Sequence, residues 1–215
     1  MSYLEVAHVD HQFKGIPVLQ DLSFSCEKGE TLCLMGPSGS GKTTVLRILA
    51  GFLHPDHGTV WLEGRDITAL KPSQRKMAMV FQSPALFPHT RIRNSIAYGL
   101  HKLSFTNTEI DQMVLDTARL LKIEDQLDQY PGTLSGGQAQ RADIARAIVR
   151  KPKILLLDEP FSSLDQNLKQ ELMEEMKRIR SELGMTMIFV THDEAEAQFF
   201  SDRIIRLCPV PASQE

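Results

Sequence analysis

A glycine-rich loop carries the clearest chemical signal in this sequence. Residues 36–44 read GPSGSGKTT, which fits GxxxxGK[ST], between an apolar run at residues 31–35 and a helical pattern at residues 42–50. Backbone N–H groups at a helix start bind phosphate, and glycines let the chain curl closely around it. This context predicts a nucleoside triphosphate site. Its expected residues are Gly36, Pro37, Ser38, Gly39, Ser40, Gly41, Lys42, Thr43 and Thr44.

Two side chains of this loop suit particular tasks. The ammonium group of Lys42 is positioned to reach the β- and γ-phosphates of a bound nucleotide. The hydroxyl of Thr43 is a natural ligand for Mg²⁺. The loop therefore predicts a magnesium ion together with the triphosphate.

Polar residues end three further apolar runs. Gln82 follows residues 77–81, Asp158 and Glu159 follow residues 154–157, and His192 follows residues 185–191. Short apolar runs separated by helical segments indicate a parallel sheet, which binds ligands beyond the carboxyl ends of its strands. We therefore expect these side chains to converge on the phosphate loop. Taken singly, each also fits a structural role, as a turn residue, a polar strand end or a hydrogen-bonded histidine.

The hydrophobic pattern predicts strands separated by helices. The expected strands are residues 3–9, 22–26, 31–35, 58–62, 77–81, 153–158, 185–191 and 203–207. One expected helix covers residues 42–50 and ends at Gly51, and another follows Asp165 and ends at Gly184. The apolar stripe of the second helix indicates packing, not a cofactor site.

The middle of the chain differs from the rest. Residues 83–133 lack strand alternation and carry helical patterns at residues 92–99 and after Thr106. Glu109 stands three residues after Thr106, which is the spacing of a capping box. This segment is expected to be a helical insert that interrupts the sheet.

Composition is typical of a compact domain that needs no disulfides. The chain has 215 residues, of which 42% are hydrophobic, and a formal net charge of −3. Cys26, Cys33 and Cys208 lie on apolar runs without metal spacing, so they are expected to be core thiols in a reducing compartment. The absence of a concentrated basic stripe argues against a nucleic-acid groove. The tail at residues 208–215 is expected to be unstructured.

No targeting or membrane signal is evident. The N-terminus lacks the basic and apolar segments of a signal peptide, and no apolar run reaches the roughly 18 residues needed to span a bilayer. Any membrane association is therefore expected to come through a partner.

A second helix start follows the insert. Residues 134–138 read LSGGQ directly before the helical pattern AQRADIARAIVR, which places Ser135, Gly136 and Gly137 where phosphate can bind. A serine-capped helix after flexible glycines is the structural alternative. The ordered set of phosphate loop, Gln82, LSGGQ, ILLLDEP, SSLD and His192 resembles the nucleotide-binding subunits of ABC transporters. This resemblance extends from Tyr3 to Leu207.

The resemblance implies an α/β fold of the ABC ATPase type among P-loop NTPases. Its parallel-sheet core carries an N-terminal antiparallel β portion and a helical insert. The implied organisation is one ABC ATPase domain over residues 1–215, with a RecA-like core at 1–82 and 153–208 and a helical subdomain at about 83–152. Related importer subunits usually continue past the last strand into further helices and often a regulatory domain, whereas this sequence ends at Glu215. A C-terminal regulatory domain is therefore expected to be absent.

The resemblance also assigns roles within the site, with ATP and Mg²⁺ as cofactors. Asp158 is expected to orient Mg²⁺ through its water shell, together with Thr43 and Gln82 as metal-site residues. Glu159 is expected to polarise the attacking water as the base. His192 would contact the γ-phosphate, Gln82 would link the metal and water to the membrane partner, and Lys42 completes the catalytic set.

Further implied contacts lie outside the phosphate loop. Phe13 would stack on adenine, although the family more often has tyrosine there. Asp165 would communicate across a dimer. In a head-to-tail homodimer, each ATP would lie between the Lys42 loop of one chain and the signature of the other. The signature residues are Ser135, Gly136, Gly137 and Gln138.

The implied function is to power an ABC transporter, as a peripheral protein on the cytoplasmic face of the inner membrane. Integral permease subunits would dock between Gln82 and Gly99, where FPHTRIRNSIAYGL resembles importers of ferric iron, polyamines, thiamine or sugars. A solute-binding protein would be an indirect partner, and no nucleic acid is expected. The sequence does not reveal the transported solute.

Other functions fit less well. ATPases of DNA repair insert long coiled coils before the signature, for which this chain has no room. A P-loop kinase has no use for LSGGQ or His192. A non-transport ABC ATPase coupled to a membrane complex, for mechanotransmission or lipoprotein sorting, stays open. Asp143 departs from the family, which usually has a small or apolar residue there, and the sequence leaves open whether it faces solvent.

Overall fold

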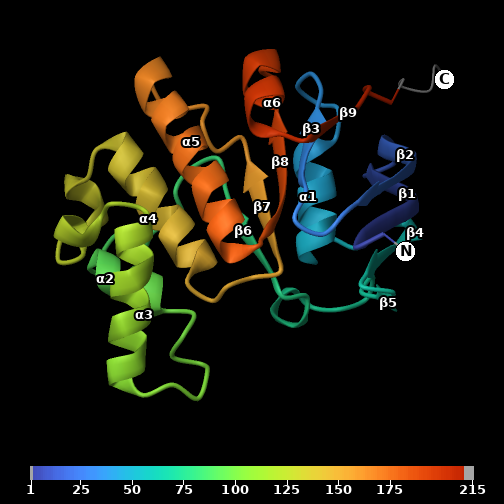
Figure 1. Cartoon of the computed structure of the whole chain (residues 1–215). Helices are drawn as coiled ribbons and strands as arrows, with labels where there is room; N and C mark the ends of the chain where they lie inside the picture. The colour runs from blue at the N-terminus through green and yellow to red at the C-terminus, as the bar shows by residue number, and fades with distance from the viewer. Residues whose placement is uncertain (1, 211–215) are drawn as a thin grey trace.

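The computed structural model describes residues 2–210 and shows a parallel sheet between an antiparallel sheet and a group of helices (Figure 1). The predicted α/β fold, with an N-terminal antiparallel portion and a helical insert, is confirmed. The strands are β1 Leu4–Phe13, β2 Ile16–Cys26, β3 Thr31–Met35, β4 His57–Leu62, β5 Arg65–Asp66, β6 Met77–Val80, β7 Ile154–Asp158, β8 Thr186–Thr191 and β9 Arg203–Arg206. The α-helices are α1 Lys42–Ala50, α2 Ile92–Ala97, α3 Asn107–Leu120, α4 Gly136–Ile148, α5 Gln166–Leu183 and α6 Glu194–Phe200.

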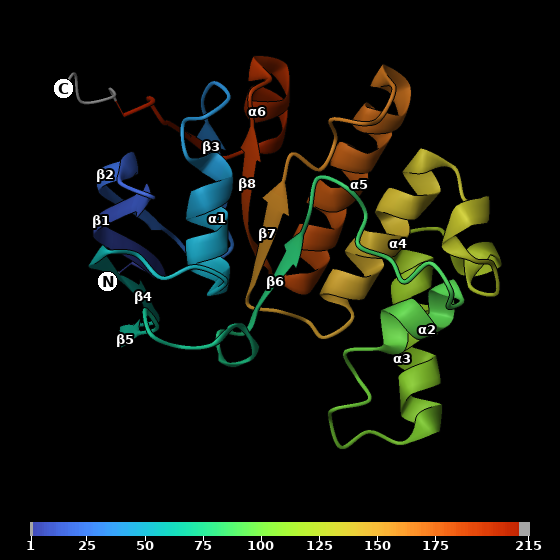
Figure 2. The ribbon, with the colours of Figure 1, turned by 180° about the vertical axis from the view of Figure 1, so that it is seen from behind.

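The central sheet has the strand order β6-β7-β8-β3-β9, and all its neighbouring strands are parallel. Alternate residues of β7 enter different cores. Ile154 and Leu156 pack in the core that contains α1, whereas Leu155 and Leu157 pack in the core of α5 and α6. Figure 2 shows α1 in front of the sheet, with α5 and α6 behind it. Because both faces are covered, the inner strands β7, β8 and β3 appear in the sequence as largely apolar runs.

The antiparallel sheet, of order β2-β1-β4-β5, begins with a long hairpin. Its turn consists of Lys14 and Gly15, which have positive φ angles of 52° and 84°. The predicted strands at residues 3–9 and 22–26 are too short. Register shifts along β1 interrupt its pairing with β2, so the period-two pattern that would reveal a strand is lost.

Helices alone form the regular structure between β6 and β7 in the described chain. Thr106 caps α3, and the predicted capping box with Glu109 is present. Ser135 caps α4, where its hydroxyl accepts a hydrogen bond from the Gln138 N–H at 3.3 Å. Both helix starts predicted in this region are therefore confirmed.

The last two helices pack on the same face of the sheet. α5 begins after Asp165, ends at Gly184 as predicted, and buries Leu172, Met176 and Ile179. The helix α6 was not predicted. It has only seven residues, and its start is marked by Asp193, whose carboxylate accepts the N–H groups of the first turn.

One expectation about burial needs correction, and one open question about burial is answered. Cys26 and Cys33 are buried, but Cys208 is exposed because the chain has already left the sheet after β9. Asp143 does not face solvent: it is fully buried in α4, which packs against α2 and β6. Arg146, one turn further along the same helix, donates to the Asp143 carboxylate at 3.0 and 2.8 Å.

The remaining expectations concern the chain ends and the membrane. Residues 211–215 of the predicted unstructured tail lie outside the described residues. Within residues 2–210, no helix combines the length and the apolar character required to cross a bilayer.

Candidate active site

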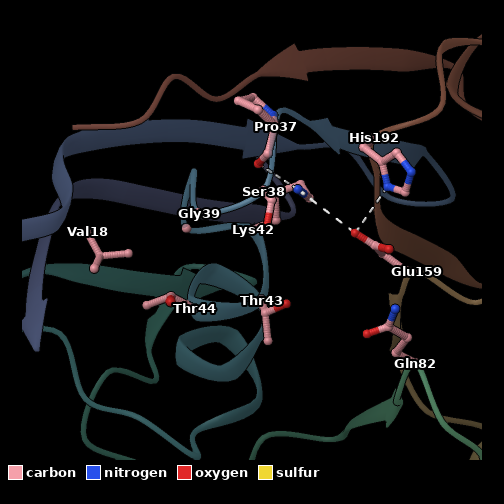
Figure 3. Close-up of a pocket in the computed structure, with 11 residues that line it drawn as sticks. Val18, Pro37, Ser38, Gly39, Lys42, Thr43, Thr44, Gln82, Glu159 and His192 are labelled. Atoms are coloured by element: carbon pink, nitrogen blue, oxygen red, sulfur yellow. Dashed lines mark hydrogen bonds and ion pairs between the residues drawn. The ribbon is translucent and has the colours of Figure 1, made fainter. Parts of the chain in front are cut away.

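A pocket of about 660 Å³ opens at the carboxyl ends of the parallel strands (Figure 3). It gathers most of the phosphate loop and three of the polar residues that follow strands in the sequence, which confirms their predicted convergence. Its lining residues are Val18, Pro37, Ser38, Gly39, Gly41, Lys42, Thr43, Thr44, Gln82, Glu159 and His192. Gly36 and Ser40 complete the loop without lining the pocket.

The phosphate loop connects β3 to α1 and depends on its glycines. Gly41 has a φ angle of 87°, in the left-handed region that other residues rarely adopt. A Cβ atom there would lie 2.6 Å from Leu19 Cδ2 and 3.0 Å from the carbonyl oxygen of Val18. The hairpin thus folds directly over the loop. Sequence reasoning missed Val18, because nothing local signals this long-range contact.

Lys42 lies at the centre of the pocket. Its Nζ donates to the carbonyl oxygens of Gly36 and Pro37 at 2.8 and 2.9 Å. The same atom is 4.0 Å from Oε1 of Glu159. Figure 3 marks this ion pair with a dashed line. An ammonium group has three donors, so these contacts fix its direction while it still faces the pocket.

Asp158 lies beneath the pocket instead of lining it. Its Oδ1 accepts a hydrogen bond from the Thr43 hydroxyl at 2.9 Å, and its side chain is buried. Burial raises the pKa of Asp158, whereas the Thr43 hydrogen bond and the cations Arg47 and Lys42 lower it. A bound divalent cation would favour the ionised carboxylate further.

The donor set at this point fits Mg²⁺ bound beside phosphate. Within residues 2–210, no group of three or more His, Cys, Asp or Glu side chains could hold a metal ion. Mg²⁺, however, is commonly held by one or two protein oxygens together with phosphate oxygens and water. Thr43 and Asp158 supply such oxygens next to the phosphate loop.

Glu159 occupies an unusual backbone position for its residue type. Its φ angle is 44°, and its carbonyl oxygen accepts hydrogen bonds from the N–H and the hydroxyl of Ser162. This turn redirects the chain after β7 and brings the carboxylate into the pocket. Oε1 lies 3.4 Å from Nδ1 of His192, so the two predicted residues meet (Figure 3).

Three other predicted groups lie outside this pocket. Phe13, at the end of β1, is 43% exposed. Ser135 caps α4, and Asp165 caps α5 by accepting the N–H groups of Asn167 and Leu168 at 3.1 Å each. In both views of the ribbon, α4 lies beyond the parallel sheet from α1. One chain therefore does not bring its own signature to its own phosphate loop.

A phosphate loop at the carboxyl edge of a parallel sheet, beside adjacent carboxylates, defines a P-loop nucleotide-binding protein. The family model described as "ABC transporter" matches residues 19–162, and the chain belongs to this family. The predicted resemblance to ABC nucleotide-binding subunits is confirmed.

Individual relatives support this assignment. The chain is 46% identical over 206 residues to "Spermidine/putrescine import ATP-binding protein PotA" of Marinobacter nauticus, covering 96% of this chain and 55% of the relative. The protein of that name from Protochlamydia amoebophila is 48% identical over 197 residues, covering 92% and 53% respectively. The chain thus spans about half the length of the curated relatives it matches.

Solved structures agree on the fold. CbiO1 from Clostridium perfringens, described as part of the ABC transporter complex cbiONQ, superimposes with a TM-score of 0.88 at 27% identity, covering 96% of this chain and 84% of its own. The ATP-binding cassette MJ0796, a dimer in a post-hydrolysis state with ADP and Pi, gives a TM-score of 0.84 at 29% identity. That match covers 95% of this chain and 94% of the neighbour.

Proposed function

We propose that this chain binds and hydrolyses ATP to power an ABC importer, with a polyamine as the transported solute. The meeting of the phosphate loop with Gln82, Glu159 and His192 in one pocket is the observation that carries the ATPase assignment. The names of the relatives, which are spermidine/putrescine import proteins, support the solute class.

The proposed division of labour follows the geometry of the pocket. Lys42 and backbone N–H groups of the phosphate loop would bind the phosphates, and Thr43 and Asp158 would hold Mg²⁺ with Gln82 nearby. Mg²⁺ would neutralise charge on the phosphate oxygens. Glu159 accepts a proton from the attacking water, and His192, 3.4 Å away, orients that carboxylate and contacts the γ-phosphate.

The adenine would stack on Phe13, which is exposed at the end of β1 on the hairpin that also supplies Val18 to the pocket. Aromatic rings offer a flat apolar surface for a base, and an exposed ring can provide it without rearrangement of the core. We place this contact beside the phosphate loop because Val18 and Phe13 belong to the same hairpin.

A second copy of the chain would complete each site. Ser135, Gly136, Gly137 and Gln138 begin α4, away from the pocket of their own chain. In a head-to-tail dimer, this helix start would face the phosphates bound by the partner, with Asp165 near the contact. The dimeric state of MJ0796 supports this arrangement.

Integral permease subunits would dock on the segment from Gln82 to Gly99, with a solute-binding protein as an indirect partner. A groove of about 570 Å³ lies beside this segment and includes Tyr98, Gly99 and Leu103. Its basic side chains are Lys76, Arg146, Arg150, Lys151 and Lys153. We infer a peripheral position on the cytoplasmic face of the inner membrane, without nucleic acid.

The chain would act as one ABC ATPase domain, with a core at 1–82 and 153–208 and a helical subdomain at about 83–152.

Uptake of labelled putrescine tests this proposal. In cells whose only copy of the chain carries Glu159→Gln, uptake should fall to background while the protein still copurifies with its permease. Uptake of an unrelated amino acid is the control. Normal putrescine uptake by this variant would refute the proposed function.

A further inference from the structure

A second pocket lies on the antiparallel sheet, and none of the residues assigned to the nucleotide site lines it. It measures about 390 Å³ and lies between the β1–β2 hairpin and the start of β4. Its charged and titratable lining residues are Asp10, His11, Asp56 and His57. Neither the proposed ATPase reaction nor the proposed docking segment uses these four side chains.

Among these four residues, His11 gives the strongest indication of a missing ligand. The residue is only 8% exposed, yet neither of its ring nitrogens has a hydrogen-bond partner among the described residues. Nδ1 lies 3.5 Å from Oδ2 of Asp56, without hydrogen-bond geometry. Burial of both ring nitrogens without a hydrogen-bond partner costs free energy, because each nitrogen has lost its water. A hydrogen-bond partner for either nitrogen would offset part of this desolvation cost.

The pocket is negatively charged. Asp10 and Asp56 each use one oxygen to accept a backbone N–H, from Asp21 at 2.7 Å and from Gln12 at 2.8 Å. Their other oxygens make no hydrogen bond within residues 2–210, and no Lys or Arg lines the pocket. The missing occupant should therefore be a cation that donates hydrogen bonds.

Its size and walls favour an organic cation over a metal ion. The described residues provide no group of three or more His, Cys, Asp or Glu side chains that could hold a metal. The volume of about 390 Å³ far exceeds that of a single ion, and Pro17, Leu19 and Val210 give the pocket an apolar wall. A cation with a short hydrocarbon part would use both kinds of surface.

We propose that this pocket binds a small aliphatic ammonium ion. Its N–H groups donate to the free carboxylate oxygens of Asp10 and Asp56. A turn of the buried His11 ring toward the pocket lets one ring nitrogen accept a further N–H group. Its methylene groups pack against Pro17, Leu19 and Val210.

Binding of an ammonium ion in this pocket should change the affinity of the nucleotide site for ATP. The rings of His11 and Phe13 meet edge-on with centroids 4.7 Å apart, and Leu19 packs against Gly41 of the phosphate loop. An ammonium ion that fixes His11 would hold Phe13 in place, so ATP should bind about twofold to tenfold more tightly. This second step rests on the proposed stacking of adenine on Phe13.

The test is NMR of the full chain with isotope-labelled histidine, titrated with n-butylammonium in the absence of nucleotide. Resonances of His11 and His57 should shift, whereas n-butanol, which has the same carbon chain without the charge, should have no effect. Asp56→Asn and Asp10→Asn should each weaken binding about tenfold or more. Asp21→Asn is the matched control, because Asp21 is exposed on the same hairpin and pairs with His8 instead.

Several results would overturn the site: equal shifts with n-butanol, tighter binding of Mg²⁺ or Zn²⁺ at His11, or unchanged affinity in both pocket variants. If either variant unfolds, the other decides. Binding of n-butylammonium without any change in ATP affinity would refute only the coupling step. Because the titration omits nucleotide, failure of the proposed ATPase function, seen as normal ATP affinity in Lys42→Ala, is a separate outcome.

Discussion

Glu159 combines a backbone role with a side-chain role. Its left-handed φ angle of 44° turns the chain after β7, a conformation that glycine adopts at lower cost. The side chain nevertheless reaches Lys42 and His192 from this turn.

We expect Glu159→Gln to bind MgATP normally while turnover falls about 10²- to 10⁴-fold, because the amide keeps the shape but cannot accept the proton. ATP affinity and hydrolysis should be measured on the same preparation. Glu174→Gln, an exposed change on α5, serves as the control and should hydrolyse ATP at the normal rate. Full activity of Glu159→Gln would remove this residue from the base role.

Gly41→Ala should abolish ATP binding. The new Cβ would combine a φ angle of 87° with overlap at Leu19 Cδ2, 2.6 Å away. Gly64→Ala is a matched control, since Gly64 has a φ angle of 73° but no atom within 4 Å of the added Cβ. That variant should cost only about 1 kcal/mol of stability and retain ATP binding. Calorimetry and urea unfolding separate the two effects, and equal behaviour of the variants would contradict the overlap.

Titration of Asp143 should lower the free energy of unfolding as pH rises. Burial raises its pKa, against the opposing effect of Arg146, so the folded chain binds the proton more tightly than the unfolded chain. Stability should therefore decrease between the ordinary aspartate pKa of about 3.9 and the higher pKa of the folded state. Asp143→Asn removes this titration, so the variant should gain stability relative to wild type across that window.

Asp66 provides a control of opposite sign. The hydroxyl and N–H of Thr68 donate to its carboxylate and lower its pKa. This stabilisation is present above the unfolded pKa and is lost as pH falls through the folded value. Asp66→Asn should therefore lose stability relative to wild type as pH rises through this lower window. Urea unfolding over a pH series measures both variants, and slopes of the same sign would refute the assignment.

At the scale of elements, the strands buried on both faces were the ones predicted most accurately from the sequence. β3 and β7 lie inside the sheet with both faces covered, so their apolar runs marked them almost to the residue. Caps located α3, α4 and α5. The hairpin was underestimated because register shifts along β1 disrupt its alternation, and α6 is too short to show a helical period.

Some residues of the candidate sites could be predicted from the sequence, and others could not. Gln82, Glu159 and His192 could be predicted because each follows a recognisable strand, and parallel strands place such residues at one edge. Val18 and the unpartnered nitrogens of His11 could not, because both arise from packing of the hairpin against segments far along the chain. A pattern of neighbouring residues contains no information about that packing.

Phe87→Ala should impair recruitment to membranes that contain the permease, by about tenfold, while ATP affinity of the isolated chain stays normal. Phe87 packs against the exposed Tyr98 with tilted rings at a centroid distance of 4.8 Å, so its loss alters the proposed docking surface without reaching the phosphate loop. Phe199→Ala, an exposed aromatic on α6, is the control. Sedimentation with membranes gives the readout, and equal recruitment of both variants would place docking elsewhere.

At the scale of the whole molecule, the separation of Ser135 from its own phosphate loop predicts complementation. Lys42→Ala and Ser135→Arg homodimers should both be inactive. A head-to-tail heterodimer contains one intact site and one site with both defects, so activity should return to at most about half of wild type. A mixed-subunit ATPase titration with differential tags measures this. Verified heterodimers without any recovery would contradict independently competent sites shared between chains.

The order of strands in the central sheet also bears on how the chain must be made. β3 ends at Met35, yet both of its neighbours, β8 and β9, lie at residues 186–206. Until those residues have been synthesised, both edges of this apolar strand lack their native partners. The phosphate loop that follows β3 therefore acquires its supporting sheet only after β8 and β9 have been made, and the open edges of β3 favour aggregation until then.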